Sequence, residues 1–399
     1  MEIISDLHLH GRYARGCSKD LSIPNLEKYA KIKGINLLGT GDFTHPEWAK
    51  HLKESLSETS AGSGIYSTKT GQKFLLSAEI SLMYSQGGKG RKVHLVILAK
   101  NFDIVSQITE ALKKRGRVDY DGRPIFDIPC PEFVDMMMNI DNDIEIIPAH
   151  AWTPWFGIFG SKSGFDSLEE CFGEKTRHIH AIETGMSSDP PMNWRLSKLD
   201  KVNLVSFSDS HSYWPWRIGR EATIFDCEMS YSGIISAIRT RKGLKMTIET
   251  DPGYGIYHYT GHRNCGICIP PSEALKLKNI CPKCGKLLTV GVLQRVEELA
   301  DRPEGFIPKN AVPFKDMLPL SEVISLATGT GIATKKTFEV YYRLLKEFET
   351  EFSVLLNADE EKIRFLVGEK LSSLIIKNRN SGIKVSPGCD GEYGKPVME

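Results

Sequence analysis

Short apolar runs alternate with stretches of helical periodicity along residues 1–247. Several of these runs are almost continuously apolar, which is typical of strands that are buried on both faces. The expected strands are residues 2–8, 36–42, 73–80, 93–99, 143–149, 178–183, 203–208 and 222–225. The expected helices are residues 23–33, 102–114, 131–140, 194–198 and 232–241. This alternation predicts an α/β fold with a parallel sheet or a barrel, in which reactive side chains gather at the carboxyl ends of strands.

The pattern changes after residue 247. Two CxxC pairs, separated by twelve residues, stand in a segment with several lysines. Beyond them, apolar residues recur every three or four positions and predict helices at residues 292–300, 320–327, 334–356 and 360–377. We therefore expect three parts: a barrel over residues 1–247, a cysteine-rich module over residues 248–300, and a helical domain with a tail over residues 301–399.

The composition is ordinary for a soluble globular protein, with 41% hydrophobic and 25% charged residues and a formal net charge of +1. This balance indicates no class of partner, so a nucleic-acid-binding surface would have to be a local basic patch. No apolar run approaches the roughly 20 residues that span a bilayer. Nine cysteines, four of them in the CxxC pairs, do not resemble a disulfide framework. We expect a cytoplasmic location.

Metal-binding side chains stand at or near the ends of the expected strands. They are His8, His10, Asp42, Glu79, His94, His150, Asp209 and His211, although His94 precedes most of its apolar run. Each alone is readily explained as a core or turn residue, but packing does not explain the whole series. Imidazole and carboxylate together suit zinc, manganese or iron better than magnesium, which is kept as a fourth option. Eight ligands exceed the needs of one tetrahedral ion, so we expect two or three.

Clustered divalent ions activate water and clamp the oxygens in displacement at phosphorus. Glu79 is suited to bridge two ions. We therefore expect Asp209, Glu79 and His8 to be catalytic, with Asp209 also orienting the attacking water. His45 stands in Thr44-His45-Pro46-Glu47, where Thr44 and Glu47 have the spacing of a capping box, and we interpret it as a helix-start residue rather than a ligand.

Two aromatic segments follow the predicted ligands His150 and His211. The first contains Trp152, Trp155 and Phe156, and the second contains Trp214, Trp216 and Arg217. Such rings either cover the barrel as a small core or form a surface on which a nucleobase stacks. The sequence leaves both interpretations open.

The two CxxC pairs predict a zinc ribbon. Cys265, Cys268, Cys281 and Cys284 have the spacing of a structural four-cysteine site. A closed thiolate site has no open coordination position, so its zinc would serve folding rather than chemistry.

The motifs Asp6-Leu7-His8-Leu9-His10, Gly41-Asp42, Ala78-Glu79, Val93-His94-Leu95, Pro148-Ala149-His150 and Ser208-Asp209-Ser210-His211 resemble those of the polymerase and histidinol phosphatase (PHP) superfamily. That resemblance implies a distorted seven-stranded β/α barrel with up to three catalytic metals. The chain has Phe43 where the superfamily usually has a histidine, which favours a site with fewer metals.

Barrel, ribbon and helical tail together resemble the endonuclease Q family over the full chain. Gly39-Thr40-Gly41-Asp42-Phe43 and Asp390-Gly391-Glu392-Tyr393-Gly394 add to this resemblance. It implies DNA repair by hydrolysis of the phosphodiester 5′ of uracil, hypoxanthine, xanthine or an abasic site, leaving a 3′-hydroxyl and a 5′-phosphate. Damaged DNA is then the expected partner. A sliding clamp is a further candidate partner, although no clear clamp-binding box is present. The alternatives are a phosphatase for a small phosphomonoester and a non-catalytic nucleic-acid-binding protein.

Overall fold

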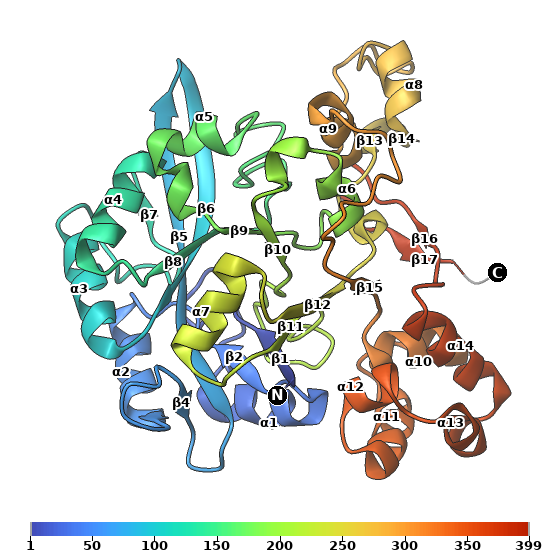
Figure 1. The fold of residues 1–399 in the computed structure, drawn as a ribbon. Helices are drawn as coiled ribbons and strands as arrows, with labels where there is room; N and C mark the ends of the chain where they lie inside the picture. The colour runs from blue at the N-terminus through green and yellow to red at the C-terminus, as the bar shows by residue number, and fades with distance from the viewer. Residues whose placement is uncertain (1, 398–399) are drawn as a thin grey trace.

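A mixed sheet of eleven strands is the centre of the computed structural model, which describes residues 2–397 (Figure 1). Its strands are β1 (Glu2–Asp6), β2 (Leu37–Gly39), β3 (Ser57–Glu58), β4 (Tyr66–Ser67), β5 (Lys73–Gln86), β6 (Lys89–Ala99), β7 (Ile125–Phe126), β8 (Glu145–Pro148), β11 (Ala222–Asp226), β12 (Leu244–Glu249) and β15 (Phe314–Asp316). A separate parallel pair is formed by β9 (Ala181–Glu183) and β10 (Asn203–Val205). The fold is the expected α/β class with a distorted PHP-type barrel.

The direction of the strands explains how the site is assembled. Strands β1, β2 and β5 are parallel, whereas β6 runs antiparallel to β5 and β8. Ser81 of β5 is therefore paired with His94 of β6. The antiparallel direction is why His94, in the middle of β6, lies beside the carboxyl-terminal half of β5.

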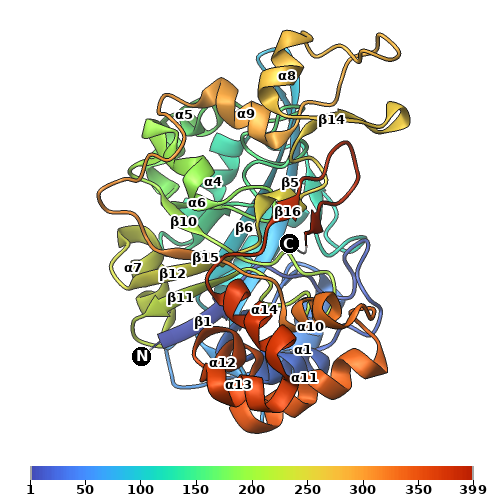
Figure 2. The same ribbon diagram turned by 90° about the vertical axis from the view of Figure 1, so that its right-hand side faces the viewer.

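Helices cover the outside of the sheet (Figures 1 and 2). They are α1 (Ile23–Lys33), α2 (Pro46–Ser55), α3 (Phe102–Lys113), α4 (Cys130–Ile140), α5 (Leu168–Phe172), α6 (Pro190–Trp194) and α7 (Tyr231–Thr240). Short 3₁₀-helices occur at Gly173–His178, Ser197–Leu199, Pro252–Tyr254 and Arg263–Cys265. Helix α1 illustrates the local rules: Pro24 lies in its first turn, and Gly34 ends it with a φ of 91°.

The cysteine-rich module follows the barrel. It contains β13 (Thr260–His262), β14 (Ile267–Ile269), α8 (Pro271–Lys276) and α9 (Val292–Leu299). The chain then returns to the barrel, because β15 pairs in parallel with β12. We therefore propose to keep the three-part division, with β15 counted as part of the barrel sheet.

The C-terminal domain consists of five helices and a tail. The helices are α10 (Leu320–Thr328), α11 (Lys335–Phe348), α12 (Glu351–Leu356), α13 (Glu360–Val367) and α14 (Glu369–Arg379). The tail contains β16 (Val385–Ser386) and β17 (Lys395–Pro396), which lie between the cysteine-rich module and the helices (Figures 1 and 2). A buried ion pair joins the helices to the barrel, because Lys33 Nζ of α1 lies 2.6 Å from Glu351 Oε1 of α12.

Most predicted elements are confirmed within a few residues, but three of the predicted helices are wrong. Residues 334–356 and 360–377 form two helices each, because Glu349 (φ 68°) and Gly368 (φ 80°) adopt positive φ values that no α-helix continues through. Residues 194–198 are not a helix, because α6 begins after Asp189, whose side chain caps it, and ends at Trp194. Within residues 2–397, the search for helices with the length and hydropathy of a membrane span found none.

Candidate metal centre

The two histidines at the end of β1 are buried, and each is oriented by a carboxylate. His8 Nδ1 lies 2.8 Å from Glu183 Oε2, and His10 Nδ1 lies 3.0 Å from Asp42 Oδ1. These contacts occupy both Nδ1 atoms and leave both Nε2 atoms directed at Glu79 and Asp209. A carboxylate behind each imidazole is the usual arrangement around a metal-binding histidine.

Asp6 aligns this strand end with the segment that carries Asp209. The backbone N–H and the hydroxyl of Ser208 donate to the Asp6 carboxylate at 3.0 and 2.6 Å, and the N–H of Gly219 donates to it at 2.8 Å. Burial raises the pKa of Asp6 to about 6, although these hydrogen bonds lower it. Asp6 therefore positions the ligands without being one of them.

The ligands form two groups that share Glu79. The first group contains His8, His10, Glu79 and Asp209, and the second contains Glu79, His94 and His150. Within each group the ligand atoms lie within 4.8 Å of one another. Glu79 Oε2 is 3.3 Å from His10 Nε2, whereas Glu79 Oε1 is 2.7 Å from His94 Nδ1. One carboxylate thus presents an oxygen to each group, as a bridging ligand does.

These residues fit divalent ions. His8 Nε2 is buried and has no hydrogen-bond partner within the described residues, although it faces the carboxylates of the first group. A buried nitrogen of this kind is costly unless a metal or another polar partner satisfies it. Three or four imidazole and carboxylate ligands per group are the donor set of zinc, manganese or iron.

Charge in the cluster shifts the pKa of its members in opposite directions. Burial lowers the pKa of His8 and His10, but the facing carboxylates more than offset this and raise it well above its ordinary value. Burial raises the pKa of Asp209, but the charges of His8 and His10 more than offset this and lower it. Because a protonated imidazole cannot bind a metal, protons and metal ions compete for His8 and His10.

Three site residues have strained backbones. Asp42, His150 and Asp209 have φ values of 44°, 30° and 47°, in the left-handed region that residues other than glycine rarely adopt. Each follows a strand, where a sharp change of direction turns the side chain toward the cluster. Such conformations cost about 1–3 kcal/mol each and are concentrated at functional sites.

Two solved structures match the whole chain. The lesion-specific endonuclease PfuEndoQ from Pyrococcus furiosus is 30% identical, with a TM-score of 0.89, over 100% of this chain and 96% of that chain. Endonuclease Q in complex with a 27-mer duplex substrate, with an abasic lesion at the active site, is 31% identical, with a TM-score of 0.88, over 100% and 97%. This chain belongs to the endonuclease Q family. It is accordingly a hydrolase of the endonuclease type.

Sequence comparison gives a further relative. The MJ0043 C-terminal domain family matches residues 319–382, which contain the helices α10 to α14. The uncharacterized protein MJ0043 from Methanocaldococcus jannaschii is 35% identical over 254 residues, covering 62% of this chain. The match covers 31% of MJ0043, so this chain spans about a third of that relative's length.

Two predicted ligands of the endonuclease Q barrel lie outside both groups. Asp42 directs one oxygen at His10 Nδ1 and accepts a 2.6 Å hydrogen bond from the Gly11 N–H with the other. Asp42 therefore orients His10, and its predicted role as a direct ligand stays a prediction. The ring of His211 is tilted by 59° to that of His10, with centroids 4.5 Å apart, and its role as a ligand stays a prediction.

His45 lies at the N-cap of α2 and stacks on Tyr13, as expected of a helix-start residue. The predicted capping box is wrong, because the cap is His45 itself. The hydroxyl of Thr44 is buried without a hydrogen-bond partner in the described residues.

A cavity of about 800 Å³ opens above the metal ligands. Some of the aromatic candidates line this cavity and others do not. Trp155, Phe156 and Arg217 line it, together with Tyr393 of the tail. Trp152 is fully buried, and its Nε1–H donates to Asn193 Oδ1 at 2.8 Å. The prediction that Trp152 contacts a base is therefore wrong.

Trp214 and Trp216 are also packing residues. Their rings stack with centroids 5.0 Å apart, and Trp216 contacts Phe338 of α11. Neither lines the cavity, so a contact of these two rings with a base stays a prediction. They instead join the barrel to the helical domain.

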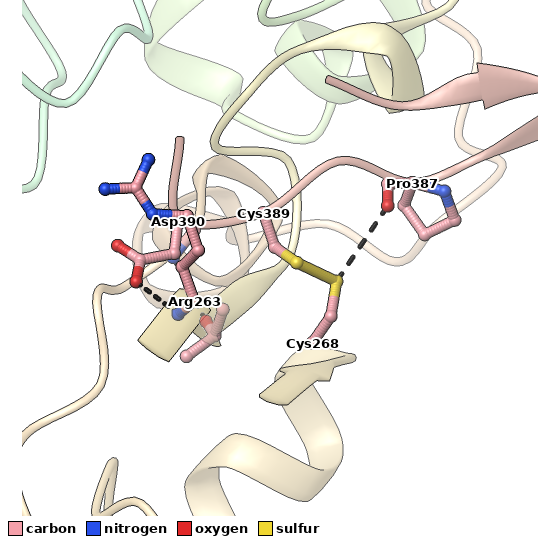
Figure 3. Close-up of a disulfide and its surroundings, with 7 residues drawn as sticks. Arg263, Cys268, Pro387, Cys389 and Asp390 are labelled. Atoms are coloured by element: carbon pink, nitrogen blue, oxygen red, sulfur yellow. Dashed lines mark hydrogen bonds between the residues drawn. A yellow bond between two sulfur atoms is a disulfide. The ribbon is translucent and has the colours of Figure 1, made fainter. Parts of the chain in front are cut away.

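The cysteine cluster differs from the prediction by one ligand. Cys265, Cys281 and Cys284 lie together with His262, whose Nδ1 is 3.4 Å from Cys284 Sγ. Cys268 instead forms a disulfide with Cys389 of the tail (Figure 3). Its partner lies 121 residues away, so the spacing of the CxxC pair could not reveal it.

Sequence reasoning missed two residues of the barrel site. Glu183 accepts a hydrogen bond from the backbone N–H of His150 at 3.0 Å and also orients His8. Glu183 is the last residue of the strand predicted at residues 178–183, so its position at a strand end could have indicated it from the sequence. Arg123 lies in a loop, where no such signal exists, and its Nη1–H donates to Glu79 Oε2 at 2.9 Å.

Proposed function

We propose that this endonuclease hydrolyses DNA on the 5′ side of uracil, hypoxanthine, xanthine and abasic sites. The products would carry a 3′-hydroxyl and a 5′-phosphate. The observation that carries the proposal is the bridging position of Glu79, with one oxygen toward each ligand group beneath an open cavity. Membership of the endonuclease Q family, and the relative whose duplex substrate has an abasic lesion at the active site, support DNA as the substrate.

The first group would hold one ion through His8, His10 and Asp209, and the second another through His94 and His150. Divalent ions bound there supply Lewis acidity that activates water and neutralises charge on the phosphate. The Asp209 side chain is about one-third exposed and lines the cavity. Its carboxylate can therefore accept a hydrogen bond from the attacking water and orient that water.

The cavity would receive the extruded lesion. An abnormal base becomes accessible to such a cavity when it is extruded from the stack, and flat aromatic side chains suit its binding. Trp155 and Phe156 supply rings on one wall, and Arg217 supplies a positive charge on the rim.

Cleavage of labelled duplexes tests the proposal. Duplexes with one abasic site, uracil, hypoxanthine or xanthine, and an undamaged control, are incubated with the protein and Mg²⁺, Mn²⁺ or Zn²⁺. We expect one nick 5′ of each lesion and none in the control. Hydrolysis of p-nitrophenyl phosphate without nicking would support a phosphatase instead, and binding without cleavage would support a non-catalytic protein.

A further inference from the structure

One arginine enters the metal centre from a loop. Arg123 precedes β7, and its Nη1–H donates to Glu79 Oε2, the oxygen that faces the first ligand group. The Arg123 side chain is 22% exposed and lines the cavity. Glu79 is the one hydrogen-bond acceptor of this guanidinium among the described residues. Four of its five N–H donors therefore remain for another group.

The backbone of this loop is fixed on both sides. Asp121 Oδ1 accepts hydrogen bonds from the N–H groups of Arg123 and Arg15, at 3.1 and 3.2 Å. The N–H of Ser81 in β5 donates to the carbonyl of Pro124 at 3.1 Å. A Cβ atom at Gly122 would lie 2.3 Å from Asp42 Oδ2, so the loop packs directly on the Asp42–His10 pair. The guanidinium is consequently held in place before any substrate arrives.

The other arginines of the cavity are placed differently. Arg220 is engaged by Thr250 Oγ1 at 3.3 Å and faces Glu322 and the ring of Tyr254, while Arg217 is exposed at the rim. Asp42 faces the same side as Arg123 and carries the opposite charge, with its oxygens at His10 Nδ1 and the Gly11 N–H. Arg123 is thus the fixed cation nearest to the Glu79 bridge on that side.

We propose that Arg123 binds the scissile phosphate directly and stabilises the negative charge that develops on it during hydrolysis. Its hydrogen bond to Glu79 aims the guanidinium, and its free N–H groups match the paired oxygens of a phosphate. This inference rests on the proposed function and assigns to it a phosphate-binding residue. The competing role is that of a simple counter-ion for Glu79, which would affect metal content instead.

A binding experiment separates the two roles without any cleavage. Affinity is measured for a lesion duplex with a normal scissile phosphate and for one with a neutral methylphosphonate at that position. In the wild type, we expect the neutral linkage to weaken binding about tenfold, because it loses a charge-assisted contact. In Arg123→Gln the same change should weaken binding clearly less, because only the contact between the ions and the phosphate is then lost. An equal loss in both proteins would overturn the proposal.

Kinetics and metal content complete the test. Single-turnover nicking by Arg123→Gln should fall about 10²–10³-fold, as when one transition-state donor is removed. Added guanidinium ion should restore part of it, and Arg123→Lys should retain more than the Gln variant. Native mass spectrometry should count the same ions as in the wild type. The matched control is Arg117→Gln, an exposed arginine of the same segment that pairs with Asp119.

Each outcome decides the question. Unchanged nicking, or a loss that follows a loss of metal, would overturn the phosphate-binding role. Failure of the wild type to nick any lesion would count against the proposed function, whereas the methylphosphonate comparison would still report on Arg123. Thermal melting of both variants shows whether the fold is retained.

Discussion

The barrel and the cysteine-rich module both gather metal-binding side chains, but they do so over very different distances along the chain. His10 and Asp209 are 199 residues apart and meet in a buried centre whose backbone turns are strained. His262, Cys265, Cys281 and Cys284 come from one short segment, and Cys284 is exposed. A centre that must hold reacting groups depends on the whole fold, whereas a centre that organises a small module needs only local spacing.

The largest effect is expected from a substitution in the metal centre of the barrel. Asp209→Asn should lower the single-turnover nicking rate about 10³-fold or more, because it removes an anionic ligand and the partner of His10. Asparagine tolerates the positive φ of this position better than alanine does, so the fold should persist. The control is Glu110→Gln on the exposed face of α3. A rate within tenfold of the wild type would remove Asp209 from the mechanism.

The second largest effect is expected from a substitution in the cysteine-rich module. Cys281→Ser should remove one bound ion and unfold residues 260–290 locally, because binding energy at such a site is folding energy. Limited proteolysis should then cut within this segment, while the main melting transition of the barrel stays near that of the wild type. Loss of the barrel's own ions in this variant would show that the two centres are not independent.

A third prediction concerns a buried carboxyl of the barrel that binds no metal. Glu249 ends β12, accepts a 2.8 Å hydrogen bond from Thr184 Oγ1, and is fully buried. Burial, with added repulsion from Asp316 and Asp189, raises its pKa to about 8. The folded protein thus keeps a proton that the unfolded chain releases above its ordinary pKa of 4.5. Stability contributed by this group is therefore full below that pH and is lost as the pH rises to about 8.

Glu249→Gln should remove this loss. The unfolding free energy of the variant, relative to that of the wild type, should increase between pH 5 and pH 8 by as much as a few kcal/mol, since one pKa unit corresponds to about 1.4 kcal/mol. Thermal melting at several pH values measures it. A variant whose advantage is the same at both ends of the range would contradict the assigned protonation.

The smallest effect is expected when the disulfide between the module and the tail is removed. Cys389→Ser should release the tail and free the Cys268 thiol, which could then join the neighbouring cluster. We expect faster hydrogen exchange in residues 385–397 and tighter zinc binding, with nicking changed less than about threefold. Unchanged exchange in the tail would show that its backbone hydrogen bonds, and not the disulfide, hold it in place.

The sequence could indicate most of the candidate barrel ligands because they stand just after strand ends, which converge in such folds. Glu79 and His94 instead lie within the long strands β5 and β6. It could not predict the role of Asp42, whose oxygens are engaged by the histidine and the amide that a different strand supplies. It overvalued Trp152 because an aromatic residue beside a ligand has the same local pattern whether it faces the core or the cavity. The CxxC spacing located the cluster, but the fate of Cys268 depends on a distant tail residue.

We propose above all that Glu79 joins two ion sites that act together on one phosphate. Native mass spectrometry can count the ions on each chain while nicking of an abasic-site duplex is followed during metal reconstitution. We expect nicking to appear only when the barrel holds its second ion, in addition to the ion of the cysteine cluster. Full nicking with a single barrel ion would contradict it.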